Sequence, residues 1–119
     1  MAAAPEIAWR IERDLTSIAA EVDDLPTVAA EWQQWTDANR ASYSLDWDHL
    51  MLDYLAELDE YWQDGCLSAD QPAGYRELLR KLDRALPLLQ QLGLCLPPIS
   101  LEARVAALPS SVTPTVEAS

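Results

Sequence analysis

Apolar residues recur at helical spacing along three stretches of the chain, residues 6–24, 45–64 and 75–92. The stretch from Ser44 to Gly65 contains no glycine or proline before its end, so we expect one helix about 30 Å long. Successive residues placed about 100° apart bring eight apolar residues of this helix onto one broad face. That face comprises Trp47, Leu50, Met51, Tyr54, Leu55, Leu58, Tyr61 and Trp62.

A second face of the same predicted helix is acidic. Carboxylates at i, i+4 spacing destabilise a helix by a few tenths of a kcal/mol, so their accumulation gains little for the fold. Two interpretations follow: a solvated face that keeps the protein soluble, or a docking surface. We call this set of residues the acidic stripe, and it comprises Asp46, His49, Asp53, Glu57, Glu60 and Asp64, while Asp48 and Asp59 lie on a flank between it and the apolar face.

The N-terminal part predicts two helices. The first covers residues 6–24 and ends near Pro26, because proline removes a backbone donor and disfavours helical geometry in the residue before it. A second helix follows over residues 25–40, and a single kinked helix is the alternative. A polar turn over residues 39–44 then leads to Ser44, a suitable N-cap for the long helix.

The C-terminal part predicts a fourth helix and a short fifth one. Asp70 is placed to cap the fourth helix, which runs to about Gln91, and Pro87 should kink or split it. Ser100 can cap the fifth, Leu101–Leu108. The left-handed residues that end the third and fourth helices are expected to be Gly65 and Gly93.

These elements predict an all-α protein. Half of the 119 residues are hydrophobic, which is enough for one core. Only 3 residues are glycine, which favours helices. Short connections make neighbouring helices antiparallel. We therefore expect an up-down helical bundle of four main helices plus a short C-terminal fifth helix, with a single helical domain over residues 1–108 and a flexible C-terminal tail over residues 109–119.

The net charge of −12 is unevenly distributed. Residues 41–75 carry 8 acidic and no basic residues, whereas residues 76–119 carry 4 acidic and 5 basic ones. A negative field repels phosphate backbones and anionic membranes. The charge therefore argues against direct binding of nucleic acid or membranes and favours a basic protein as partner.

The ends of the chain and its cysteines predict a cytoplasmic protein. The N-terminus lacks the basic region and long apolar core of a signal peptide, and no apolar run approaches the roughly 20 residues that span a bilayer. Two cysteines are too few for a disulfide framework. Cys66 follows the third helix and Cys95 follows the fourth, which places them at opposite ends of an antiparallel bundle. Because a disulfide needs neighbouring Cα atoms, we expect both cysteines to be free thiols.

Candidate catalytic chemistry is sparse. Asp46, His49 and Asp53 share one helix face and could point at a metal ion. Carboxylate-bridged metal bundles, however, need Glu-x-x-His on two helices, and a single histidine cannot supply that pattern. No phosphate-binding loop or nucleophile motif is present. We therefore predict no catalytic residue, no metal and no cofactor.

The sequence thus favours a small acidic, non-enzymatic binding protein. Its expected contacts with a basic protein surface are Asp46, Asp53, Glu57, Glu60 and Asp64, with Trp9 as an exposed aromatic contact. A sharper form is a nucleic-acid mimic that inhibits or regulates a nucleic-acid-binding partner. One alternative is a structural subunit or adaptor that uses Trp and Tyr contacts, and another is a metal- or thiol-dependent enzyme using His49 or a cysteine. The sequence does not decide between a monomer and a homo-oligomer.

Overall fold

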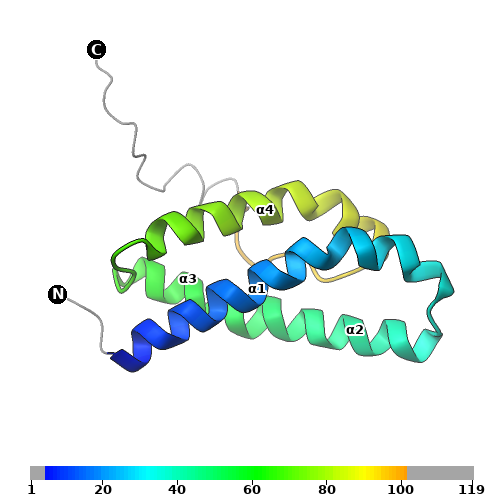
Figure 1. Ribbon diagram of the computed structural model, residues 1–119, viewed down its shortest axis with the longest axis horizontal. Helices are drawn as coiled ribbons and strands as arrows, with labels where there is room; N and C mark the ends of the chain where they lie inside the picture. Colours follow the sequence, from blue (N-terminus) through cyan, green and yellow to red (C-terminus); the bar gives the residue numbers. More distant parts are fainter. Residues whose placement is uncertain (1–4, 102–119) are drawn as a thin grey trace, which may run out of the picture.

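The computed structural model describes residues 5–101, which form three long helical rods joined by short connections (Figure 1). No strand occurs within this range. The all-α prediction is therefore confirmed, whereas four separate main helices were expected and three rods are found. The rods are α1 (Pro5–Glu31), the continuous helix α2–η2–α3 (Asp37–His49, Leu50–Leu55 and Ala56–Gln63) and α4 (Gln71–Leu92), and a short 3-10 turn, η1 (Trp32–Gln34), follows α1.

Helix α1 continues through Pro26, so the prediction that the first helix ends there is wrong. Leu25 and Val28, on either side of the proline, are both buried in the core, while Pro26 itself is exposed. The apolar stripe of the first helix therefore runs on past residue 24. Burial of these side chains outweighs the helix-breaking cost of about 3 kcal/mol for an interior proline.

The turn between the first two rods lies at residues 32–36, earlier than the predicted turn at residues 39–44. Thr36 is the N-cap of α2, because its hydroxyl oxygen accepts a hydrogen bond from the backbone N–H of Asn39 at 3.1 Å. Ser44, the predicted cap, lies inside α2, and its hydroxyl donates to the carbonyl of Arg40 at 3.0 Å. The predicted second helix over residues 25–40 is thus divided between α1 and α2.

The long middle helix contains one irregularity, the π-helical segment η2. The apolar face predicted for this helix is nevertheless buried on both sides of the segment, at Trp47 before it and at Leu58 after it. Asp59, predicted on a flank between the apolar face and the acidic stripe, is 4% exposed and accepts hydrogen bonds from the Tyr75 hydroxyl and the Gln63 amide.

Both predicted glycine helix ends are confirmed. Gly65 and Gly93 have φ values of 76° and 70°, the left-handed conformation that glycine adopts without steric cost. The residue after each glycine donates its N–H back into the helix, as Cys66 does to the carbonyl of Tyr61 at 2.9 Å. Pro87, expected to kink or split α4, lies on an exposed position of an unbroken helix.

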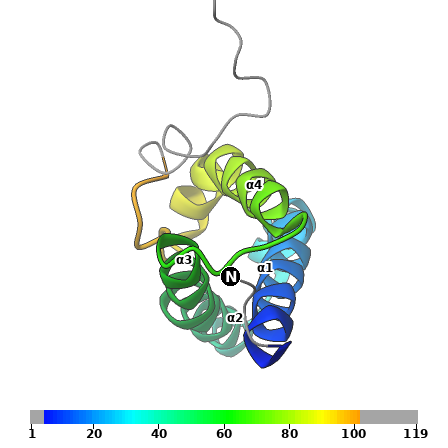
Figure 2. The same ribbon diagram turned by 90° about the vertical axis from the view of Figure 1, so that its left-hand side faces the viewer.

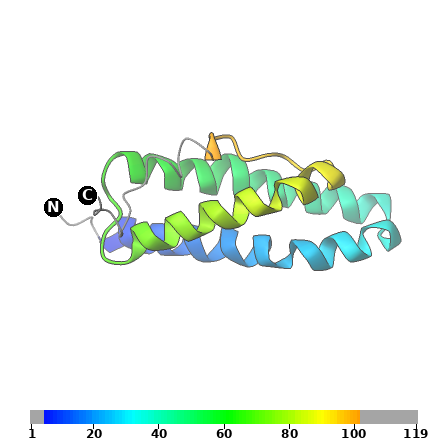
Figure 3. The same ribbon diagram turned by 90° about the horizontal axis from the view of Figure 1, so that it is seen from above.

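The rods enclose one core. Viewed along the long axis, α4 lies above, with α1 on one side and the middle helix on the other (Figure 2). After α4 the chain turns back and runs along the middle helix (Figure 3). We call this segment, residues 93–101, the C-terminal strap. The core includes Ile11, Ile18, Leu25, Trp47, Met51, Leu55, Leu58, Tyr75, Leu79, Leu82 and Leu89.

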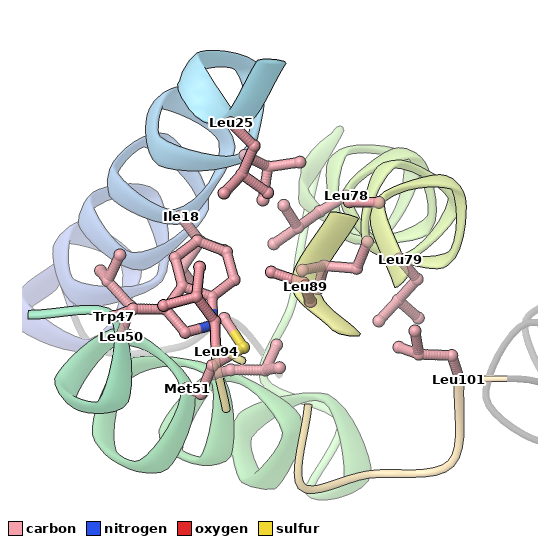
Figure 4. Packing of buried hydrophobic residues seen from close by; sticks show 14 of the residues in the cluster. Ile18, Leu25, Trp47, Leu50, Met51, Leu78, Leu79, Leu89, Leu94 and Leu101 are labelled. Atoms are coloured by element: carbon pink, nitrogen blue, oxygen red, sulfur yellow. The ribbon is translucent and has the colours of Figure 1, made fainter. Parts of the chain in front are cut away.

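The C-terminal strap contributes to the core without forming a helix over residues 93–100. Leu94 and Leu101 are buried and belong to the same core cluster as Leu50 and Met51 of the middle helix (Figure 4). The indole N–H of Trp47, itself 1% exposed, donates to the carbonyl of Cys95 at 2.8 Å. The predicted fifth helix over residues 101–108 and the tail over residues 109–119 lie outside the described residues, apart from Leu101. Within residues 5–101 no helix is both long and apolar enough to span a membrane.

Candidate acidic and aromatic groove

The acids of the predicted acidic stripe differ in their exposure and in their partners. Asp46, Glu60 and Asp64 are exposed, and Asp53 is exposed and pairs with the Nδ1 of His49 on the same helix. Glu57 is half-buried, and its Oε1 lies 2.9 Å from Nη2 of Arg13 on α1. Residues 41–75 contain no lysine or arginine, but Arg13 of α1 neutralises Glu57 across the bundle.

Arg13 organises a cluster at the N-terminal half of α1. Its guanidinium donates to Asp14 Oδ1 at 2.8 Å as well as to Glu57, and it lies 4.5 Å from the ring centroid of Tyr54. Asp14 is fully buried. Burial, followed by the neighbouring Glu57 carboxyl, raises the pKa of Asp14 to about 7, with Arg13 acting in the opposite direction. We call these residues the arginine cluster: Arg13, Asp14, Tyr54 and Glu57.

Trp9 lies beside the arginine cluster and is 63% exposed. The guanidinium carbon of Arg13 is 5.6 Å from the centroid of its ring. One side of the indole is therefore occupied by an intramolecular cation–π contact, while most of the ring reaches solvent. Its predicted role as a contact for a partner stays a prediction.

Three of the four basic residues of α4 form ion pairs with Glu77 of the same helix or with Asp23 of α1. Arg80 and Arg84 lie 4.0 Å and 3.5 Å from the carboxylate of Glu77, and Lys81 lies 2.9 Å from Asp23 on α1. Among residues 5–101, none of the α4 ion pairs reaches the acidic stripe. The basic residues of α4 therefore form no ion pair with the acidic stripe in the described part of the chain.

The acids of α1 and α2 meet in a groove between the two helices. The groove has a volume of about 690 Å³, and the C-terminal half of α1 forms one wall while α2 and η2 form the other. A smaller hollow of about 280 Å³ adjoins it and shares Trp35, Tyr43 and Asp46 with it. The acids that line the groove are Glu21, Asp24, Glu31 and Asp46, and its aromatic residues are Trp35, Tyr43, Trp47 and Tyr54.

An aromatic cluster stiffens one end of the groove. The ring centroids of Trp32 and Trp35 are 5.5 Å apart, and Tyr43 packs edge-on against both at 6.1 and 5.7 Å. Such tilted and edge-to-face contacts are favourable beyond the area they bury. The cluster joins the end of α1 to α2 across the turn at residues 32–36.

The charges in the groove are not compensated within it. Among residues 5–101, no lysine or arginine lines the groove, and His49 is the one basic residue in its walls. Burial raises the pKa of Glu21, and the carboxylates of Asp24 and Asp46 raise it further. The pKa of Tyr43 rises to about 12, because burial and then the charges of Glu21 and Asp24 disfavour the phenolate.

Sequence reasoning identified one acid of this groove, Asp46, and missed Glu21, Asp24 and Glu31. These three lie on α1, and only the pairing of α1 with α2 brings them opposite Asp46. The available signal was their shared position on the first helix, three and seven residues apart and off the apolar stripe. Their shared position on one helix does not indicate a groove until the helix that packs opposite them is known.

The remaining candidate chemistry involves the histidine and the thiols. In the portion that the structure describes, no three His, Cys, Asp or Glu side chains are grouped as a metal site. Cys66 and Cys95 are both free thiols and both half-buried. Burial, and secondarily Asp48, raises the pKa of Cys95, which favours the unreactive thiol over the nucleophilic thiolate.

Comparison with known proteins provides no relative from which a function could be transferred. No protein-family model, no curated protein and no solved structure matches the chain. The function must therefore be argued from the groove, the exposed acids and the exposed aromatic residues themselves.

Proposed function

We propose that this protein is a small, non-enzymatic binding protein that docks an acidic face on a basic protein surface. One observation carries the proposal: carboxylates from two helices converge on one groove, and no lysine or arginine among residues 5–101 lines it. Asp14 and Glu57, by contrast, both pair with Arg13. The unpaired negative charge of the groove acids therefore favours binding of a cationic partner.

The exposed part of the acidic stripe extends this field along the middle helix. Asp53, Glu60 and Asp64 reach water on α3 and η2, beyond the groove. A one-signed field of this kind speeds the encounter with a basic partner and discriminates against acidic ones more than it adds raw affinity. We expect these residues to steer a partner toward the groove.

A sharper form of the proposal is a nucleic-acid mimic. In this form the carboxylates of α1 and of the middle helix stand where the partner expects phosphates, and the protein inhibits or regulates a nucleic-acid-binding partner. Glu57 contributes less than the other acids because Arg13 neutralises it. Nucleic acid and this protein should then compete for the same partner, and competition in a binding assay tests this form separately.

The experiment that tests the general proposal has two steps. The tagged protein is purified from its own cell with crosslinking to identify the partner, and the association rate is then measured over a range of salt concentrations. We expect a basic partner surface and an association rate that falls steeply between about 50 and about 300 mM salt. A partner with a neutral or acidic contact surface, or a rate that does not depend on salt, would refute the proposal.

A second candidate function is that of a structural subunit that assembles through apolar contacts. The specific observation is that four large apolar side chains among the described residues are exposed: Trp9 at 63%, Leu45 at 69%, Leu52 at 55% and Leu96 at 44%. Large exposed apolar residues are favoured at protein interfaces. Assembly through them would depend little on salt. Trp9→Ala and Leu52→Ala would weaken such an assembly, and its stoichiometry is measured by analytical ultracentrifugation.

A further inference from the structure

The middle helix has leucine side chains on its outer side that the core does not use. Leu45 and Leu52 lie seven residues apart, which is about two helical turns, and both are more than half exposed. Ala41 precedes the first leucine by four residues and Ala56 follows the second by four, so all four lie on one side of the helix. We call these four residues the outer leucine face.

The C-terminal strap adds a third leucine to this region. The strap runs along the middle helix (Figure 3), and the carbonyl of Cys95 accepts the indole N–H of Trp47, two residues after Leu45. Leu96 follows Cys95 directly and is exposed. Exposed apolar side chains from two segments of the chain therefore lie in the same region of the surface.

The fold does not account for these leucines. Their side chains leave apolar area in water, which the folded protein would gain by burying. Helix propensity does not require them either, because lysine and glutamate are nearly as good as leucine on an exposed helix position. Single exposed apolar residues are ordinary, whereas a group of them on one side of a helix is typical of an interaction surface.

Acidic residues border the outer leucine face. Asp46 and Asp53 each follow one of the two leucines in the sequence, and both are exposed. Asp46 also lines the groove between α1 and α2. His49 pairs with Asp53 and is positively charged only when it is protonated. An occupant that matches this surface therefore combines apolar side chains with positive charges beside them.

The charge of the protein argues against two other occupants. Two copies of the chain packed through the outer leucine face would bring their bordering acids together, in a protein whose net charge is already −12. An anionic membrane would be repelled by the same acids. The outer leucine face extends over fifteen residues of one helix, about 22 Å, which matches the length of a helical segment of a partner.

We propose that the outer leucine face is the docking surface, and that its occupant is a basic amphipathic helix of the partner protein. Apolar side chains of that helix cover Leu45 and Leu52, as in the recognition of amphipathic helices by apolar surfaces. Its lysine or arginine side chains lie over Asp46 and Asp53. This inference rests on the proposed docking function and adds the apolar contacts that retain a partner after the charges have attracted it.

Three synthetic peptides of about 15 residues test the site. The first is an amphipathic helix of leucine, alanine and lysine. The second has the same composition with the leucines distributed around the helix, and the third has glutamate in place of every lysine. Binding to the full chain is measured by titration calorimetry, and the contacts are mapped from amide chemical shifts. We expect the first peptide to bind most tightly, with the largest shifts over residues 41–56.

Two double variants at the same positions test the apolar contact. Leu45→Gln with Leu52→Gln removes the apolar surface, whereas Leu45→Met with Leu52→Met keeps it with side chains of similar length. Both positions are exposed, so the core is the same in the two variants. We expect the glutamine variant to weaken binding of the amphipathic lysine peptide about tenfold or more, and the methionine variant less than about twofold.

A second pair of variants tests the bordering acids. Asp46→Asn with Asp53→Asn removes two charges beside the leucines, and the matched control Asp70→Asn with Asp83→Asn removes two exposed charges at α4. We expect the first variant to weaken the lysine peptide about three- to tenfold at low salt, and the control less than about twofold, because close charges contribute more than distant ones.

The outcomes separate this inference from the proposed function. Equal binding by the glutamine and methionine variants, or equal binding of the two lysine peptides, would overturn the outer leucine face as the site and leave acidic docking intact. Failure of the lysine peptide to bind in preference to the glutamate peptide would refute both.

Self-association provides the last test of the occupant. The full chain is studied by analytical ultracentrifugation with and without the glutamine changes at Leu45 and Leu52. We expect the same sedimentation in both cases, because the face takes a basic helix and not a second copy. A dimer that the glutamine changes dissociate would overturn the inference and assign the outer leucine face to contacts between copies of this chain.

Discussion

Acidic residues of α1 and of the middle helix come together in two regions, the arginine cluster and the groove. The two regions differ in whether a cation lies beside the acids. In the arginine cluster the carboxylates of Asp14 and Glu57 share the guanidinium of Arg13, which also lies over Tyr54. In the groove the carboxylates of Glu21, Asp24 and Asp46 have no lysine or arginine beside them in the described part of the chain. The acids of the arginine cluster are thus paired within the fold, whereas the groove acids have no such partner among the described residues.

Tyr54 connects the two regions. Its ring contacts Arg13 on one side and lines the groove on the other, and it also packs against His49 with ring centroids 5.1 Å apart. The compensated acids thus lie directly next to the uncompensated ones. Variants can therefore be designed to break one region and spare the other.

The largest effect is expected from Arg13→Ala. It removes the cation between Asp14 and Glu57 and leaves a buried carboxyl without its ion pair, which should lower the free energy of unfolding by about 3 kcal/mol at neutral pH. Urea denaturation measures the change. Arg80→Ala is the matched control, because its ion pair is exposed and should contribute less than about 1 kcal/mol. Similar losses in the two variants would mean that the cluster does not stabilise the fold.

The next largest effect concerns pH. Because the pKa of Asp14 is raised to about 7, the folded protein keeps a proton that the unfolded chain has already lost between the ordinary aspartate range and neutrality. The free energy of unfolding should therefore decrease as the pH rises through about 7. Asp14→Asn mimics the protonated form, so it should stabilise the protein at high pH by on the order of 2 kcal/mol and remove this dependence.

Denaturation curves at several pH values measure the effect of Asp14→Asn. At acidic pH, where Asp14 is protonated in both states, the variant and the original protein should have similar stability. A variant that keeps the full pH dependence would show that other groups, such as the general excess of acids, cause it.

A smaller effect of opposite sign is expected in the groove. The triple change Glu21→Gln, Asp24→Asn and Asp46→Asn relieves repulsion that no local cation offsets, so it should raise the free energy of unfolding by about 1 kcal/mol at low salt. Glu57→Gln should lower it, because that acid is paired with Arg13. Both changes are measured by thermal and urea denaturation, and a groove variant that is destabilised would remove the contrast between the two regions.

The smallest effect is expected from Tyr43→Phe in the free protein. The change removes a buried oxygen without a described partner and preserves the packing of the ring against Trp32 and Trp35. Stability should stay the same or rise by up to about 1 kcal/mol. A loss of more than that in thermal denaturation would show that the hydroxyl already has a partner in the folded protein.

The parts of the fold that depend on local chemistry could be predicted from the sequence. The apolar face of the middle helix is buried at Trp47, Leu50, Met51, Leu55 and Leu58, and Gly65 and Gly93 end their helices as expected. Each of these features is decided by periodicity or by backbone conformation within a few residues. Local rules were sufficient there.

The features that local rules missed depend on packing. Pro26 stays inside α1 because the core needs Leu25 and Val28, and Thr36 caps α2 because the turn lies where α1 ends. Asp59 is buried against α4, where the hydroxyl of Tyr75 donates a hydrogen bond to it. The groove required knowing which face of α1 lies opposite α2, and no spacing within one helix contains that information.

The C-terminal strap also affects how the protein opens. Its residues between Gly93 and Leu101 lack the ladder of backbone hydrogen bonds that a helix provides, yet they cover Trp47 and accept its indole N–H. Segments of this kind detach at a lower free energy than whole-protein unfolding. The indole proton of Trp47 should therefore exchange with deuterium through a local opening, faster than the amide protons in the middle of α4. A single tryptophan resonance thus reports on whether the core is closed while the three rods remain folded.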